Sequence, residues 1–106
     1  MNLQQLREKL EKGFYLDNLY EMARLCKSLA LDTASPASFF VMEQVFLGIA
    51  RDWEDRPLPV EEAKQVEEKV IQTLKDLVDG IGANASSEEV FNLLNMVVSA
   101  YLISFM

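Results

Sequence analysis

The sequence contains no histidine, and this absence removes most catalytic chemistry from consideration. Histidine is the most common general base and the usual imidazole ligand of metal ions. Without it, neither a Ser-His-Asp triad nor the Glu-x-x-His motif of di-iron bundles can form within this chain. A glycine-rich phosphate loop is also absent, because Gly80-Ile-Gly82 is too short and follows a predicted helix instead of a strand.

Cysteine is almost absent as well, because Cys26 is the only one. A single cysteine excludes an intramolecular disulfide and a thiolate metal cluster. Cys26 falls on the apolar face of a predicted helix, so we interpret it as a buried structural thiol and not as a reactive one. The N-terminal residues lack the apolar core of a signal peptide. Both features predict a reducing compartment, the cytoplasm.

No hydrophobic run is long enough to predict a membrane span. The longest uncharged stretch, residues 90–106, has 17 residues, whereas a spanning helix needs about 20. Four polar side chains interrupt it: Asn92, Asn95, Ser99 and Ser104. We therefore expect a buried helix there and not a tail anchor.

Positive charge is scarce, with 10 Lys and Arg against 17 Asp and Glu and a net charge of −7. Because Lys and Arg supply the affinity for nucleic acids and anionic membranes, we expect neither as a partner. The paired carboxylates lie on polar faces or at predicted helix starts, where they need no further explanation. They are Glu61-Glu62, Glu67-Glu68 and Glu88-Glu89. We therefore expect no metal, no cofactor and no enzymatic activity, and an enzyme that uses carboxylates alone is the least favoured alternative.

Apolar residues at helical spacing fill the rest of the sequence, of which half is hydrophobic. This pattern predicts an all-α fold, with residues 1–106 forming a single helical domain. We expect a compact bundle of about five helices, at roughly residues 2–12, 15–31, 36–54, 59–80 and 87–105.

The predicted helix 15–31 is amphipathic. Its apolar face is expected to hold Leu16, Leu19, Ala23, Cys26 and Ala30. Its polar face is expected to hold Asp17, Asn18, Glu21, Arg24 and Lys27.

Turn and cap residues mark several helix ends. Gly13 is typical of the position just after a helix, and Ser35 before Pro36 of a helix start. Ser86 and Glu89 have the spacing of a capping box, in which each side chain accepts a hydrogen bond from the other residue's backbone N–H. The helix boundaries are therefore predicted from several independent signals.

The predicted helices 36–54 and 87–105 are apolar over most of their circumference. In helix 87–105 the polar residues form one thin stripe, which consists of Glu88, Asn92, Asn95 and Ser99. Two such helices are hard to bury within a five-helix domain, and exposed apolar patches usually mark an interface. A two-fold homodimer is the simplest way to cover them. The alternative is a monomer that buries all of this surface internally.

The charged segment 51–56 contains the only tryptophan and offers a candidate partner-binding site. Arg51, Trp53 and Arg56 belong to the residue types most enriched in interface hot spots. Alternatively, Trp53 continues the apolar stripe of its helix into the core while its neighbours face water.

These observations favour a non-enzymatic protein–protein interaction or regulatory protein that forms a homodimer and binds another protein. The alternative is a carrier or sensor that holds an apolar small molecule between helices. It depends on the six Phe and five Met residues, which are suited to soft apolar pockets.

Overall fold

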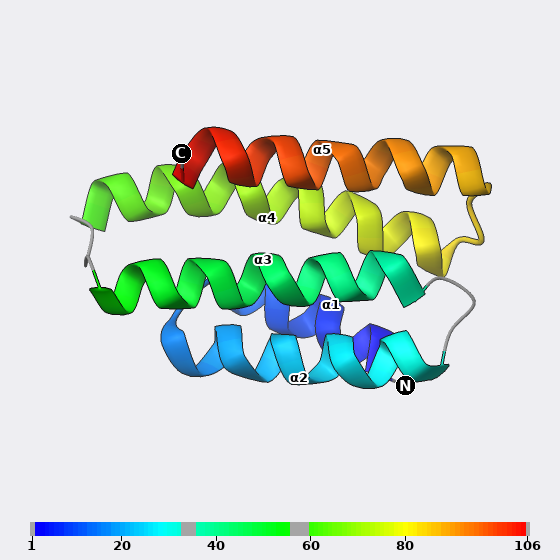
Figure 1. The fold of residues 1–106 in the computed structure, drawn as a ribbon, viewed down its shortest axis with the longest axis horizontal. Helices are drawn as coiled ribbons and strands as arrows, with labels where there is room; N and C mark the ends of the chain where they lie inside the picture. Colours follow the sequence, from blue (N-terminus) through cyan, green and yellow to red (C-terminus); the bar gives the residue numbers. More distant parts are fainter. Residues whose placement is uncertain (1, 33–35, 56–59, 106) are drawn as a thin grey trace. The chain divides into compact units, whose positions relative to one another are not determined.

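A computed structural model describes residues 2–32, 36–55 and 60–105, all of whose secondary structure is helical (Figure 1). The helices are α1 (Asn2–Lys12), α2 (Leu16–Asp32), α3 (Pro36–Asp55), α4 (Val60–Gly82) and α5 (Ser87–Phe105). The predicted all-α class and its five helices are confirmed, and each helix ends within two residues of the predicted position. The expected Ser35 cap lies outside the described residues.

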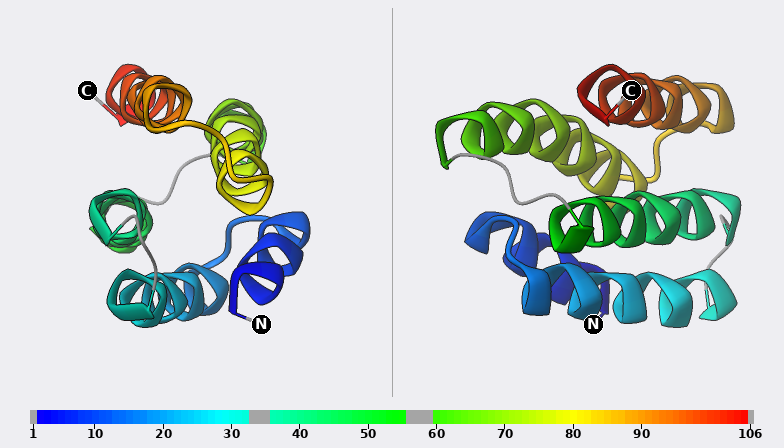
Figure 2. Two further views of the ribbon diagram at one scale, coloured as in Figure 1. Left: turned by 90° about the vertical axis from the view of Figure 1, so that its right-hand side faces the viewer. Right: turned by 60° about the vertical axis from the view of Figure 1, so that its left-hand side comes forward.

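The helices fall into two compact units, 1–59 and 60–106. In the first unit, α2 packs antiparallel against α3, and α1 folds back onto α2 (Figure 2). The second unit is an antiparallel hairpin of α4 and α5 (Figure 1). The expectation that residues 1–106 behave as one domain stays a prediction.

The first unit has a well-filled apolar core. Its α2 side chains follow the predicted stripe at Leu19, Ala23 and Cys26, all of which are buried. Leu16 was expected on the same face, but it lies at the first position of α2 and is exposed. The other buried apolar residues of this unit are Leu6, Leu10, Phe14, Met22, Leu29, Phe39, Met42, Val45, Phe46, Ile49 and Ala50.

Asn18 fastens the turn between α1 and α2. Its side-chain amide nitrogen donates to the carbonyl oxygens of Lys9, at 2.9 Å, and Gly13, at 2.6 Å. Gly13 has a φ of 87°, which only glycine adopts without strain. The expectation that Asn18 lies on the polar face of α2 is therefore wrong, because its side chain is 1% exposed. It is buried since it satisfies carbonyl groups that the end of α1 leaves unpaired.

In the second unit, the turn after α4 is closed by a Schellman motif. Ala85 N–H donates to the Gly80 carbonyl and Asn84 N–H to the Ile81 carbonyl, with Asn84 at a φ of 58°. The next helix begins with Glu89 N–H donating to the Ser86 hydroxyl at 3.2 Å. This is one of the two hydrogen bonds expected from the capping box.

Gly80 also allows α4 and α5 to approach each other closely. A Cβ atom at this position would lie 2.7 Å from a terminal methyl group of Leu93. Among the side chains of this hairpin that the structure describes, the buried ones are Val70, Leu74, Leu77 and Val78 on α4 and Val97 on α5.

We expect replacement of Asn18 by alanine to lower the free energy of unfolding by about 2 kcal/mol, because two carbonyl groups lose a buried donor. Urea denaturation followed by circular dichroism measures this change. Lys27→Ala, an exposed substitution on the same helix, is the control and should stay within about 0.5 kcal/mol. Equal stability of the two variants would contradict the role assigned to Asn18.

Candidate interaction surface

The structure describes two of the three residues that were predicted to bind a partner, and only one of these two is exposed. Arg51 is exposed on the last turns of α3, Trp53 is half-buried, and Arg56 lies outside the described residues. The indole ring of Trp53 contacts the ring of Phe14, with a centroid separation of 6.2 Å and an interplanar angle of 63°. Trp53 is therefore partly a core residue, and its role in binding a partner stays a prediction.

Phe14 connects the turn after α1 to the far end of α3. Besides Trp53 it contacts Phe46 in an edge-to-face arrangement, with ring centroids 6.2 Å apart. The Trp53 indole N–H is buried and has no hydrogen-bond partner among the described residues. This aromatic group holds the end of α3 in place and leaves less of Trp53 available to another protein.

The outer surface of α5 exposes several large apolar side chains. Residues 90–105 carry no charged side chain, yet several large apolar side chains there face solvent. Their exposed fractions are 62% for Phe91, 52% for Met96, 45% for Leu102 and 79% for Ile103. Val97 is the one fully buried apolar side chain among the described residues of α5. The sequence predicted an excess of apolar surface here without identifying its members.

The large apolar residues that α5 exposes lie in two parallel stripes along the helix. Phe91 and Leu102 are separated by about three helical turns and so share one side, as do Met96 and Ile103, which are about two turns apart. The exposed residues Asn92, Asn95 and Ser99 lie between the two stripes. The thin polar stripe that the sequence predicts for this helix therefore runs along the middle of an otherwise apolar outer face.

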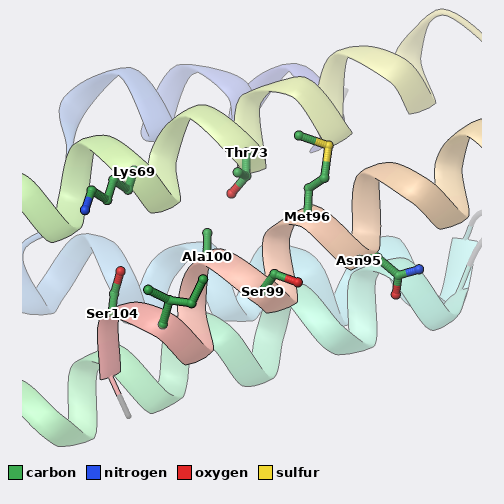
Figure 3. Close-up of a pocket in the computed structure, with 8 residues that line it drawn as sticks. Lys69, Thr73, Asn95, Met96, Ser99, Ala100 and Ser104 are labelled. Carbon is green, nitrogen blue, oxygen red and sulfur yellow. The ribbon is translucent and has the colours of Figure 1, made fainter.

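An open groove of about 550 Å³ lies between α4 and α5 (Figure 3). Met96 and Ala100 point from α5 toward α4, and Thr73 points back from α4, whereas Asn95 points away from α4 (Figure 3). The groove has an apolar floor with hydroxyl groups and one lysine around it. Its lining residues are Lys69, Thr73, Asn95, Met96, Ser99, Ala100, Ile103 and Ser104.

The described residues offer little else that could carry chemistry. Cys26 is buried as predicted, and this burial raises the pKa of its thiol far above the ordinary value, so the reactive thiolate does not form near neutral pH. Over residues 2–32, 36–55 and 60–105, no three acidic, cysteine or histidine side chains gather closely enough to hold a metal ion. Within the same ranges, none of the helices combines the length and apolar character that crossing a membrane requires.

Polar side chains also contact one another between helices of the first unit. Lys9 on α1 forms an ion pair with Glu21 on α2, and its ammonium group lowers the pKa of that carboxyl group. The Tyr20 hydroxyl on α2 donates to the Glu54 carboxylate on α3 at 2.8 Å, which raises the pKa of Tyr20. Both contacts lie at or near the surface and join α2 to its two neighbouring helices.

Comparison with protein-family models, curated proteins and solved structures finds no match for this chain. A function therefore has to be inferred from the geometry of the described residues.

Replacing Trp53 with alanine should lower the free energy of unfolding by about 2 kcal/mol, because Phe14 loses a ring contact in a partly buried site. Trp53→Phe, which keeps an aromatic ring, should lose less than half as much. Arg51→Ala is the control on the exposed side of α3 and should change stability little. Chemical denaturation of the three variants measures these differences. Unchanged stability of Trp53→Ala would mean that the indole is free for a partner.

Proposed function

We propose that this chain is a non-enzymatic protein–protein interaction or regulatory protein that acts as a homodimer. The observation that carries this proposal is the outer face of α5, where Phe91, Met96, Leu102 and Ile103 are exposed on an uncharged helix. Large apolar side chains that are exposed on one helix favour burial against another molecule. The cytoplasmic location expected from the cysteine content is part of this proposal.

The charge distribution makes this face the one on which a second copy meets the least repulsion. Each chain carries a net charge of −7, so two copies repel each other over most of their surfaces. Residues 90–105 are the longest part of the described chain without charge, and contact there brings the fewest like charges together. Another protein would then bind elsewhere, and the end of α3 around Arg51 and Trp53 is the surface that we propose for it.

Native mass spectrometry of the complete chain should show a species with twice the chain mass of 12.1 kDa. Sedimentation velocity at several concentrations provides the matching measurement in solution. A single-chain mass in both experiments at tens of micromolar protein would overturn the homodimer.

The groove between α4 and α5 favours a second candidate function, that of a carrier or sensor for an apolar small molecule. Its volume of about 550 Å³ lies in the range of small-molecule sites, roughly 300–1,000 Å³. Met96, Ala100 and Ile103 would contact the apolar part of the ligand, while Thr73 and Lys69 lie where a polar group could be bound.

If the groove holds such a ligand, organic extraction of freshly purified protein should release a hydrophobic compound that mass spectrometry detects. Ala100→Phe fills the groove and should abolish this signal, whereas Phe91→Ala, outside the residues that line it, should not. An empty extract from the unmodified protein would count against the carrier function.

A further inference from the structure

One stripe of α5 has the spacing of a coiled-coil seam. Positions 91, 95, 98 and 102 follow one another at intervals of 4, 3 and 4 residues, the a/d pattern of a heptad repeat. Phe91, Asn95 and Leu102 are exposed and Val98 is half-buried. This seam (Phe91, Asn95, Val98 and Leu102) therefore lies away from the side of α5 that packs on α4.

The seam is complementary to itself when two helices run in opposite directions. In an antiparallel pair, each a position faces a d position of the other helix. If Phe91 faces the partner's Leu102, then Asn95 faces the partner's Val98, and both contacts occur twice by symmetry. The two-fold axis then crosses α5 at the level of residues 96 and 97, the middle of the helix, so nearly the whole helix is paired.

The charges at the start of α5 select the antiparallel direction over the parallel one. Glu88 and Glu89 are exposed in the first turn. A parallel pair would bring Glu88 of both copies together, because this residue lies three positions before Phe91 on the side of the seam, and like charges at close range oppose association. An antiparallel pair with Phe91 opposite the partner's Leu102 places the two Glu88 residues about 25 Å apart along the helix axis.

Asn95 fixes the register of such a pair. Its amide group both donates and accepts hydrogen bonds, so it can bond to the same amide of a second copy. In the antiparallel register the two Asn95 residues lie only about 4.5 Å apart along the helix axis. A shift by one heptad moves the two amides further apart along the helix axis, to about 6 Å in one direction and about 15 Å in the other, and a buried polar residue at an a position is known to specify coiled-coil register.

We propose that two copies of this chain pair through α5, antiparallel about a two-fold axis, with Phe91 of each copy against the partner's Leu102. This assignment depends on the self-association proposed above and names its surface, direction and register. The stripe of Met96 and Ile103 stays outside the centre of the contact, beside the groove between α4 and α5.

Cysteine cross-linking tests the pairing directly. Phe91→Cys and Leu102→Cys chains are mixed, oxidised mildly and analysed by non-reducing electrophoresis and mass spectrometry. The mixture should give a covalent dimer that contains one chain of each kind. Phe91→Cys alone should not cross-link, because two copies of position 91 lie about 16 Å apart along the axis, beyond the roughly 7 Å reach of a disulfide. Cys26 is buried and should remain unreacted.

A matched control uses the neighbouring exposed position. Ile103→Cys mixed with Phe91→Cys should not cross-link, because residue 103 points about 100° away from residue 102. Cross-linking of Phe91→Cys with itself would show a parallel pair and overturn the proposal.

A second measurement avoids engineered cysteines. Leu102→Glu should raise the dimer Kd by roughly a hundredfold or more, because it buries two carboxylates at the seam. Ile103→Glu adds the same charge one residue away and should change Kd less than about fivefold. A dimer that forms without the 91–102 cross-link and tolerates Leu102→Glu would overturn the α5 pairing and leave self-association intact. A monomeric unmodified chain would overturn both.

Discussion

Helix α5 has apolar side chains on more sides than one neighbouring helix can cover. Its packing against α4 buries Val97 fully, but Phe91 and Leu102 point elsewhere and face solvent. Since an uncharged helix gains free energy only where its apolar surface leaves water, the remaining sides favour a further contact. The proposed dimer and the groove beside Met96 are two consequences of this single constraint.

The first unit is organised differently, because its apolar surface is largely internal. Cys26 and the α3 residues Phe39, Phe46 and Ile49 are buried, so α3 uses most of its apolar circumference within the unit. Polar groups there are also committed to the fold, as the contacts of Asn18 with α1 illustrate. The exposed apolar excess that the sequence predicts for two helices is thus concentrated on α5, although α3 still exposes Phe40.

Local signals in the sequence were enough to identify the helices. Which residues are exposed depends on contacts between helices, and these signals do not predict such contacts. Helical spacing predicted the burial of Leu19 and Cys26 correctly, but it assigned Asn18 to solvent and Leu16 to the core. Asn18 is buried because the carbonyl groups at the end of α1 and in the turn after it need a hydrogen-bond donor. The helical spacing of apolar residues gives no information about this need. The 4-3-4 spacing of the α5 seam was visible in the sequence, but its exposure was not.

The sequence by itself determined the all-α class, the five helices, their ends and the absence of histidine chemistry. These properties depend on spacing, caps and composition, which are local. Only the tertiary structure decided that Trp53 packs against Phe14, that Asn18 closes a turn, and that one side of α5 stays open. Each of these depends on which helix faces which, and that choice is made by packing between residues distant in the chain.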